Sequence, residues 1–552
     1  MTRNKIHSFL ILAGWGAVCV LVGSCQKNFL NKQPLDQYSD ANVWMDSALI
    51  TRYVDDIYSN MITVYDYAGY SSLINQAIIP ADLTDEAKSN FPGSVADLVN
   101  QGQYNAASNL FDAFWSSPSG YFRQNGVYES VRECNLFFSY LPTMPLSPAT
   151  KAQLSGEVHF LRAYNYQFLY SIFGRFPIIE KPLGINDDLN IPRGSDDSCV
   201  AFILNDLDTA AALLPVQYSD AGSVGRATKG AALGLQCRAL LNNKRYAEAA
   251  AAAQAVMNLN MYSLFPDYEG IFYARNDDNA EVIFNKEYGS DQSTQVQNID
   301  YYENSSFFTG FGSPEDVPTQ NMVDQYLMTD GLPWDQSPLY DPSNPYANRD
   351  PRLQASIIYD GTVWLGQTID MQKGSAYNPA TISPSITGYM LRKFLNPDFI
   401  FYGNNANYQN CIILRLAEIY LDYAECQLQL NNPEGARVYV NMLRERVGMP
   451  DVPVGQMTWD TYMRERTVEL AFEGERWNDI RRWGMGSQLI GATIYGMTIQ
   501  TTGGVRQYNR VEVEKRFFDP KMYYFPIPLA ELLKYPAGKV LEQNPGWYRA
   551  HS

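Results

Sequence analysis

The sequence predicts a mainly α fold, and three observations support this prediction. Apolar residues recur at helical spacing through several long segments. Hydrophobic residues make up 46% and charged residues 18% of the 552-residue chain, as in folded proteins. A turn containing two asparagines, followed by a helix that carries alanines, occurs twice. No Pro/Gly/Ser-rich linker divides the chain, so we expect one large unit with long loops.

The first 24 residues have the pattern of a secretion signal. Arg3 and Lys5 precede an apolar run from Phe9 to Val22. This run is shorter than the roughly 20 residues that a membrane-spanning helix needs, and it suits a signal-peptide core. We therefore expect residues 1–24 to be a lipoprotein signal peptide and residues 25–552 to form the mature protein.

The end of this signal resembles the bacterial lipobox. Val22, Gly23 and Ser24 lead directly into Cys25, the position at which such proteins receive diacylglycerol and acyl chains such as palmitate. We predict that Cys25 is the lipidation site, because several acyl chains hold a protein firmly at a membrane. The alternatives are an ordinary secretory signal and a membrane helix with an incidental cysteine.

Two helical hairpins and two further helices are predicted along the mature chain. A helix over residues 154–173 ends at a Gly followed by a Pro. Residues 227–258 form one hairpin, with its turn at residues 242–244. A second hairpin turns at residues 430–433, between an apolar stripe that starts at Ile413 and one that ends at Val447. Both hairpins weakly resemble tetratricopeptide helix pairs. One amphipathic helix is expected over residues 459–483.

Two segments interrupt the helical pattern. Residues 62–125 and 285–410 are rich in Tyr, Asn, Ser, Gly and Pro. They are too long to be simple connectors, so we expect functional loops or loops that carry short strands. Residues 362–364 are one predicted strand segment.

The composition excludes several kinds of chemistry. The chain has three histidines, of which only His159 is placed to be buried, so a site needing two histidines is excluded. A formal net charge of −17 argues against a nucleic-acid partner. The glycines at 310–312 and 484–486 lack the rest of a phosphate loop. We expect no cofactor, no metal site and no essential disulfide, although residues 276–279 resemble half of a calcium loop.

The number and order of short motifs along the mature chain indicate a known family. The motifs are FL at 29–30, PLD at 34–36, VWMD at 43–46, GEVHFLRA at 156–163, FGRFP at 173–177, PT at 318–319, DG at 330–331, RDPR at 349–352, RTVEL at 466–470, EGERWNDIRRW at 473–483, FPIP at 525–528 and QNPGW at 543–547. Together they resemble the SusD/RagB family of Bacteroidetes outer-membrane lipoproteins, over essentially the whole mature chain.

This resemblance implies both a fold and a function. The fold would be a right-handed scaffold of tetratricopeptide-like helix pairs, with long irregular loops and a few short strands. Residues 25–230 would be the N-terminal SusD-like region and residues 231–552 the C-terminal SusD/RagB region. The function would be non-enzymatic: a lipid-anchored protein on the cell-surface side of the outer membrane that binds nutrient oligosaccharide. It would act as the lid of a SusC-like TonB-dependent transporter for glycan uptake.

Two groups of residues could suggest catalysis, and for each we favour a structural role. Glu469, Glu473 and Arg476 would lie at i, i+4 and i+7 of one helix and could exchange ion pairs. His159 lies near Glu157 and Arg162, outside the apolar stripe. We predict no catalytic residue.

The ligand site is expected among loop aromatics. Sugar rings lie on flat aromatic side chains while their hydroxyls bond to polar neighbours, and Tyr serves such surfaces well. The alternative for each aromatic is packing beneath the long loops. The predicted ligand-binding residues are Tyr67, Tyr70, Asp82, Trp115, Tyr301, Tyr302 and Phe307.

Two other functions remain open. The same transporter-lid role could serve a peptide or another nutrient, as in the RagB branch of the family. A surface glycoside hydrolase would need two carboxylates roughly 5–10 Å apart, and the 59 acidic residues do not forbid such a pair.

Overall fold

The computed structural model describes most of the chain after residue 42. The described residues are 43–64, 80–108, 110–115, 126–289, 299, 303–309, 314–380, 384–398, 407–536 and 541–547. The chain divides into two compact units, one of residues 1–53 with 143–146 and one of residues 54–142 with 147–552. In the smaller unit, Trp44 packs edge-on against Tyr53, with ring centroids 4.7 Å apart.

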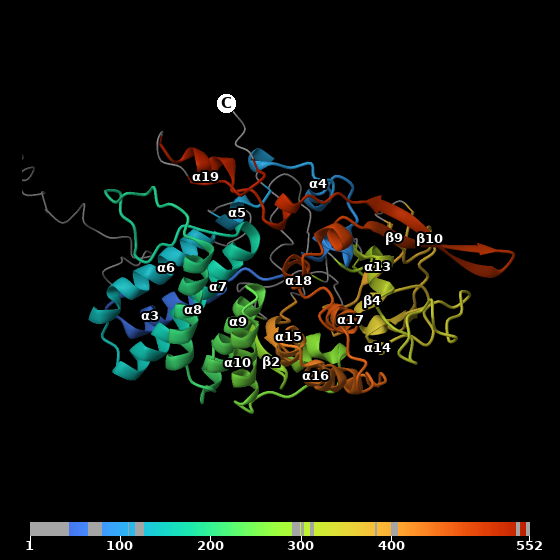
Figure 1. Ribbon diagram of the computed structural model, residues 1–552, viewed down its shortest axis with the longest axis horizontal. Coiled ribbons are helices and arrows are strands. Elements are labelled where there is room, and N and C mark those ends of the chain that lie inside the picture. Colours follow the sequence, from blue (N-terminus) through green and yellow to red (C-terminus); the bar gives the residue numbers. More distant parts are fainter. Residues whose placement is uncertain are drawn as a thin grey trace, which may run out of the picture. The chain divides into compact units, whose positions relative to one another are not determined.

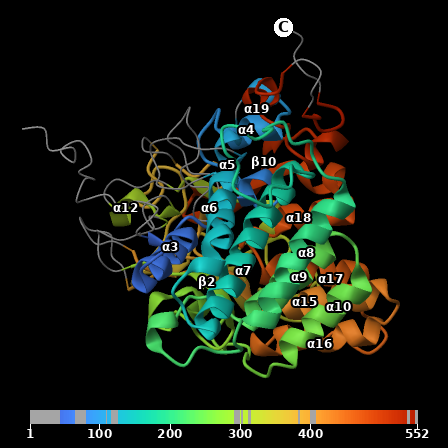
Figure 2. The same cartoon turned by 90° about the vertical axis from the view of Figure 1, so that its left-hand side faces the viewer.

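Seven helices of the larger unit form one continuous array (Figures 1 and 2). Each helix packs against the next in chain order. The helices are α6 (Val127–Tyr140), α7 (Pro148–Phe173), α8 (Asp196–Leu213), α9 (Lys229–Asn242), α10 (Tyr246–Met257), α15 (Leu416–Gln429) and α16 (Pro433–Arg446). Helices α10 and α15 are neighbours although about 160 residues separate them in sequence, so the array continues across a long insertion.

Local sequence signals set the ends of these helices. Ser147 caps α7 by accepting a hydrogen bond from the Thr150 amide at 3.1 Å, and proline follows at the first helical position. Gly174 ends the same helix with a φ of 69°, a conformation that glycine adopts at little cost. Thr228 and Asn432 cap α9 and α16 in the same way as Ser147.

Both predicted hairpins are confirmed. The first is α9 with α10, and the second is α15 with α16. Lys244 and Asn431 take positive φ values of 59° and 60° in the two turns. Buried alanines of α10, such as Ala249 and Ala253, leave room for the neighbouring helix axes to approach closely. The start of the second hairpin differs from the prediction, because Ile413 belongs to a strand before α15.

The single helix predicted over residues 459–483 is wrong. The chain forms α17 (Trp459–Glu469) and α18 (Arg476–Trp483) with a sharp break between them. Phe472 and Gly474 in this break have φ values of 65° and 91°, which no right-handed helix contains. The side chain of Phe472 is fully buried, so tertiary packing overrides the helical periodicity here.

Among the described residues, the strands form five separate antiparallel pairs. The pairs are β1 (Ala87–Ser89) with β3 (Asp316–Pro318), β2 (Val282–Lys286) with β8 (Cys411–Arg415), β4 (Ile357–Ile358) with β7 (Met390–Leu391), β5 (Val363–Trp364) with β6 (Gln367–Thr368), and β9 (Thr493–Thr502) with β10 (Val505–Lys515). Strand β5 confirms the prediction for residues 362–364. The long β9–β10 hairpin, seen at the right of Figure 1, was not predicted, although its Gly503-Gly504 turn is a typical hairpin signal.

The remaining helices are short, apart from α3. They are α3 (Ser47–Ser59), α4 (Val95–Asn100), α5 (Asp112–Trp115), α12 (Ser306–Thr309), α13 (Gln320–Val323), α14 (Pro351–Ser356) and α19 (Leu529–Leu533). Within the described part of the chain, no helix combines the length and the apolar character that crossing a membrane requires.

Two hydrophobic clusters stabilise the larger unit. One lies between α15, α16 and α17 and includes Leu421, Val440 and Tyr462, all without exposed surface. Burying each such side chain contributes roughly 1.5–3 kcal/mol. The other cluster lies mainly in the insertion between α10 and α15. It is centred on Tyr326 and Tyr389 and includes residues of β9. The insertion therefore shares a core with residues of other segments, such as Ala87 and Phe472.

Candidate functional site

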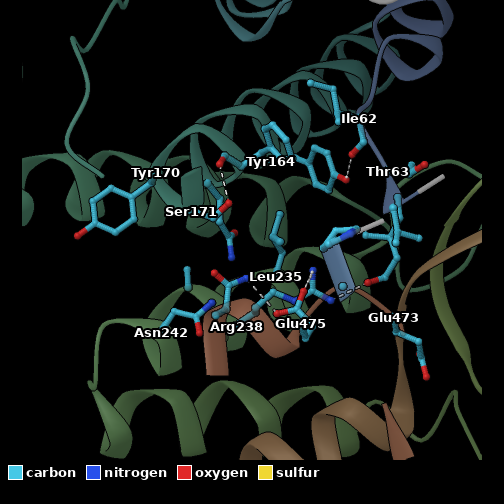
Figure 3. Close-up of a pocket in the computed structure, with 18 of the residues that line it drawn as sticks. Ile62, Thr63, Tyr164, Tyr170, Ser171, Leu235, Arg238, Asn242, Glu473 and Glu475 are labelled. Atoms are coloured by element: carbon cyan, nitrogen blue, oxygen red, sulfur yellow. Dashed lines mark hydrogen bonds and ion pairs between the residues drawn. The ribbon is translucent and has the colours of Figure 1, made fainter. Parts of the chain in front are cut away.

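A pocket of about 130 Å³ lies where α7, α9 and α18 meet the segments at residues 62–64 and 411–413 (Figure 3). Tyr164 and Ser171 reach it from α7, and Leu235 and Arg238 from α9. These positions follow from the helix period, because residues three, four or seven apart share one helix face. The pocket is therefore built by the helix array.

Carboxylates neutralise Arg238 in this pocket, whereas Arg481 donates to the Ser171 carbonyl and to Asn478. Arg238 donates to the Glu418 carboxylate at 2.7 Å and to the Ile413 carbonyl at 2.6 Å, and it lies 3.2 Å from Glu475. Burial raises the pKa of Glu475, and the nearby Arg238 opposes this rise. The buried side-chain oxygen of Gln167 accepts no hydrogen bond within the described part of the chain. The pocket wall thus combines apolar surface with polar side chains from several helices.

One predicted loop begins and ends at this pocket. Val64 and Pro80 both line it. Residues 65–79, which contain the predicted ligand residues Tyr67 and Tyr70, lie outside the described residues. Cys25, Tyr301 and Tyr302 also lie outside them, so the structure does not test these predictions.

Two predicted ligand residues are buried. Asp82 has no exposed surface; burial, with Asp316 adjacent, raises the pKa of its carboxyl well above the usual range. Trp115 is 3% exposed and packs edge-on against Phe173, with ring centroids 5.3 Å apart. Burial supports the packing interpretation for both side chains, because neither reaches a surface that a ligand could contact.

Phe307 is the predicted residue that the structure places at a surface. Its side chain is 45% exposed, and its ring centroid lies 4.4 Å from that of Tyr377. The Tyr377 hydroxyl donates to the exposed side-chain oxygen of Gln367 at 3.3 Å. The arrangement combines aromatic surface with a polar neighbour, as sugar recognition requires.

Sequence reasoning missed Tyr377 and Gln367. Ser305 Oγ donates to the Tyr377 carbonyl at 2.8 Å and so ties two segments about 70 residues apart. The composition of residues 285–410 marked this region as functional, but no spacing in the sequence pairs these two positions. The pocket residues Gln167 and Arg238 were missed for a related reason, since both belong to ordinary helical patterns.

Glu469 lies at the centre of a buried ionic network. Its carboxylate accepts hydrogen bonds from Arg415 at 2.7 Å, Arg446 at 2.5 Å and Arg352 at 3.0 Å. Burial alone would raise its pKa, but the three guanidinium groups together lower the pKa well below the usual range. A carboxylate that stays ionised and has no exposed surface cannot act as a general acid. The network agrees with the structural role favoured from the sequence.

The predicted ion pairs within one helix are wrong in detail. Glu473 bonds to Arg415 and Lys393 at 2.7 Å and 2.6 Å. Arg476 instead makes a two-point bond to Asp85, at 2.9 Å and 2.8 Å. The break between α17 and α18 separates these residues from a common helix face, so each finds a partner from a distant segment.

His159 has the structural role that was predicted. Its Nδ1 atom lies 2.7 Å from the Asp206 carboxylate, which also accepts two hydrogen bonds from Arg162. The imidazole packs 4.4 Å from the Phe138 ring centroid. All of these partners belong to the helix array and none lines the pocket of Figure 3.

Metal and thiol chemistry finds little support in the described ranges. Within them, no group of three or more His, Cys, Asp or Glu side chains is arranged to hold a metal ion. In the half calcium loop, Asp277 accepts from the Asn410 amide and Asp278 accepts from Asn285 at 2.8 Å. Five described cysteines are buried: Cys134, Cys199, Cys237, Cys411 and Cys426.

Comparison with known proteins gives consistent matches along the chain. A model described as the SusD family matches residues 280–547, and one described as "Starch-binding associating with outer membrane" matches residues 28–241. A crystal structure of a SusD-like protein from Bacteroides fragilis is 30% identical, with a TM-score of 0.80, covering 94% of this chain and all of that one.

Two further proteins are similar to most of this chain. A SusD-like carbohydrate-binding protein from B. fragilis is 25% identical, with a TM-score of 0.75, covering 89% of this chain and 98% of its own. The SusD-like protein P38 of Formosa agariphila is 25% identical over 531 residues, which is 90% of this chain and 94% of that protein. Taken with the helix array and its long loop-rich insertion, these matches show that the chain belongs to the SusD/RagB family.

Proposed function

We propose that this protein is a lipoprotein of the outer membrane that binds nutrient oligosaccharide and acts as the lid of a SusC-like TonB-dependent transporter. Lipidation at Cys25 would anchor the acidic body at the cell surface. The protein would hold the glycan without chemical change, and the energised barrel would import it.

Family membership is the observation that carries this proposal. The match described as starch-binding and outer-membrane-associated supports both the ligand class and the location. The B. fragilis relative named as a carbohydrate-binding protein supports the ligand class independently. The exposed Phe307 ring beside Tyr377 adds an aromatic surface of the kind that sugars use.

The ligand contacts are proposed to come from the loop aromatics. Tyr67 and Tyr70 belong to the segment whose two ends line the pocket of Figure 3. Tyr301, Tyr302 and Phe307 belong to the segment that contains the exposed aromatic surface. We leave Asp82 and Trp115 out of this set because both are buried.

Variants of the loop aromatics test this assignment. Phe307→Ala and the double variant Tyr67→Ala with Tyr70→Ala should each weaken binding of the cognate glycan about tenfold, because one stacking contact contributes roughly 0.5–1.5 kcal/mol. Phe517→Ala is a matched control, since Phe517 is 50% exposed and Phe307 45%. Equal losses in the control and the test variants would refute the assignment.

The lid role has a separate test. Extraction of native membranes in mild detergent, followed by capture of this protein, should recover a larger barrel protein in near-equal amount. Such a complex should bury an interface well above about 1,000 Å² and survive purification. Recovery of the lipoprotein alone, from membranes that contain the barrel, would contradict the lid role.

The two alternative functions are distinguished by ligand and product. A peptide carrier would bind peptides and no glycan. A surface glycoside hydrolase would release new reducing ends from a bound glycan. Glu469 and Asp82 have no exposed surface, and Glu469 is also held by three arginines, so neither carboxyl can reach a glycan; we therefore favour binding over hydrolysis.

A further inference from the structure

A second pocket lies between α13, the loop at residues 331–346 and the β9–β10 hairpin. It has a volume of about 50 Å³ and shares no lining residue with the pocket of Figure 3. Side chains with rings or polar groups dominate its wall: Gln320, Asp324, Trp334, Tyr340, Arg349 and Arg510. None of these residues was singled out from the sequence as a ligand contact.

One wall of this second pocket is aromatic and partly exposed. The ring centroids of Trp334 and Tyr340 lie 5.1 Å apart, with 55° between the ring planes. Both side chains are intermediate in exposure. The two tilted rings therefore present apolar faces at a surface loop, where the C–H face of a sugar can lie.

The floor of the second pocket contains a buried cation that forms no direct ion pair among the described residues, although the Asp324 carboxylate of the same pocket acts on it electrostatically. Arg349 is 7% exposed and lines the pocket. Its guanidinium donates to the main-chain carbonyls of Tyr326 at 2.8 Å, Pro345 at 3.2 Å and Val323 at 2.5 Å. In the described part of the chain, no carboxylate lies within ion-pair distance of it. Buried charges are usually paired, so an anion in this pocket would supply what is missing.

A second arginine stands at the mouth of the pocket. Arg510 forms an ion pair with Asp324 and lies over the Tyr495 ring, 4.3 Å from its centroid. Asp324 also accepts a hydrogen bond from Gln320 at 2.7 Å. Arg349 and Arg510 therefore share the pocket with one carboxylate, Asp324, which already bonds to Arg510 and Gln320. The pocket is locally positive in a chain whose formal net charge is −17.

The second pocket has room for a substituent of a sugar ring but not for the whole ring. A single water needs roughly 10–15 Å³ on this measure, so the pocket holds about three to five waters. A carboxylate or sulfate group with its attachment atoms occupies similar space. The ring that carries such a group would remain outside, against Trp334 and Tyr340.

We propose that this second pocket binds an anionic sugar unit, with the ring on the Trp334–Tyr340 wall and the acidic group directed at Arg349 and Arg510. The anionic group is the carboxylate of a uronic acid or a sulfate ester, which share the same recognition chemistry. Arg349 has one N–H left for such a group, because its other four donate to main-chain carbonyls, and its positive charge attracts either anion. The protein would then select charged oligosaccharides through residues other than the sequence-predicted loop aromatics.

Fluorine NMR of the full mature chain, labelled with fluorotryptophan, gives a local test. The Trp334 resonance is assigned by its loss in Trp334→Phe, and the other tryptophans serve as internal references. The probes are a galacturonate trisaccharide, a sulfated galactose trisaccharide and a neutral galactose trisaccharide. We expect the Trp334 resonance to shift saturably with at least one charged probe and to need about tenfold more of the neutral one.

A matched pair of arginine variants tests the role of charge. Arg510→Gln should weaken binding of the charged probe about tenfold. Arg275→Gln is the control, because Arg275 also pairs with an aspartate, Asp398, and lies 4.6 Å from a tyrosine ring centroid. Three outcomes would overturn the proposal: no Trp334 shift with either charged probe, equal shifts with the neutral probe, or equal losses in the two arginine variants.

The test of the second pocket can succeed or fail independently of the test of the proposed function. The double variant Tyr67→Ala with Tyr70→Ala should keep the Trp334 shift, because the described wall of the second pocket comes from α13, residues 331–349 and the β9–β10 hairpin. Loss of neutral-glycan binding in that variant together with a retained Trp334 shift supports two sites. Loss of the shift in that variant would show that the second pocket is not an independent site, and would contradict the proposal.

Discussion

Glu469 shows how single residues are held in this protein. A fully buried carboxylate is costly unless it is paired, and here three arginines surround it. The arginines come from β8, α14 and α16, so one side chain joins three elements of the scaffold. Its role is to fix those elements, which explains why a catalytic interpretation of the surrounding motif is unnecessary.

The first residue-scale prediction concerns this network. Glu469→Gln leaves three buried guanidinium groups short of a counter-charge and should lower the free energy of unfolding by roughly 3–5 kcal/mol. Denaturant titration measures this, with Glu434→Gln as a control whose solvent-exposed pair with Arg437 should add little to stability. Glycan affinity of the folded variant should be unchanged. A stable variant that no longer binds glycan would contradict the structural role.

The second residue-scale prediction concerns pH. Burial raises the pKa of Glu86 to about 7, although Arg476 opposes the rise. Since the folded pKa exceeds the unfolded value, the folded protein holds the proton more tightly. The stabilising effect of that proton is complete below about pH 4.5 and is lost as the pH rises through about 7. Relative to Glu86→Gln, the natural chain should therefore lose on the order of 2–3 kcal/mol between pH 5 and pH 8.

Thermal unfolding of both chains across this pH range checks the second prediction. The exposed Glu445→Gln variant is the control and should track the natural chain. The Glu86→Gln variant should gain stability over the natural chain as the pH rises. A difference that is constant with pH would contradict the raised pKa of Glu86.

Single-residue roles were only partly predictable from the sequence. For His159 the sequence favoured a structural role from its position near Glu157 and Arg162, and its contacts with Asp206 and Phe138 agree with that role. The partners of Arg476 could not be predicted, because Asp85 lies nearly 400 positions away. Among the ligand candidates, sequence context marks loop aromatics but does not separate buried Trp115 from exposed Phe307. That difference depends on which neighbouring segment covers each ring.

At the scale of elements, glycines allow the β9–β10 hairpin to contact the insertion. Gly388 has a φ of 79°, and an added Cβ would lie 2.1 Å from the Met497 carbonyl of β9. The Met497 amide donates to the Thr387 carbonyl at 2.7 Å, so the two segments are in direct main-chain contact. Asn321 of α13 bonds to β9 as well, at 3.0 Å and 2.9 Å.

Two glycine variants test this contact. Gly388→Ala should cost several kcal/mol, because it combines an unfavourable φ with a clash against main chain. Gly361→Ala shares the positive φ, at 89°, but has no atom within 4 Å of the added Cβ, so it should cost only about 1–2 kcal/mol. Denaturant midpoints of the two variants measure the difference. Equal midpoints would mean that this close contact does not stabilise the fold.

Helices were predicted correctly where the apolar periodicity and the turn residues indicate the same boundaries. The α9–α10 and α15–α16 hairpins follow directly from apolar stripes separated by asparagine turns. Prediction failed at the break between α17 and α18, since the apolar period continues through residues whose backbone is set by tertiary packing. The β9–β10 hairpin was missed because its strands alternate only weakly and most of β10 faces solvent.

At the scale of the whole molecule, the helix array carries loop-rich segments that are distant in sequence. Helices α10 and α15 pack together across the insertion that contains both Phe307 and the second pocket. A scaffold made of repeated helix pairs can support such an insertion because each pair buries its face on the next. Binding surfaces can therefore vary while the array is retained.

Anchoring is a prediction at this scale. Cys25→Ala should prevent acylation, because no thiol remains to receive the lipid. The variant should then leave the outer-membrane fraction, and labelled palmitate should no longer be incorporated. Cys134→Ala is the control, since Cys134 is buried and should leave both readouts unchanged. Continued labelling of Cys25→Ala would contradict lipidation at this position.

Titration calorimetry of residues 26–552 against a panel of oligosaccharides and peptides tests the central claim most directly. The predicted result is saturable heat with at least one glycan, no heat with peptides, and no new reducing ends after prolonged incubation. Saturable heat with peptides alone, or steady release of reducing ends from the bound glycan, would contradict a non-enzymatic glycan-binding role.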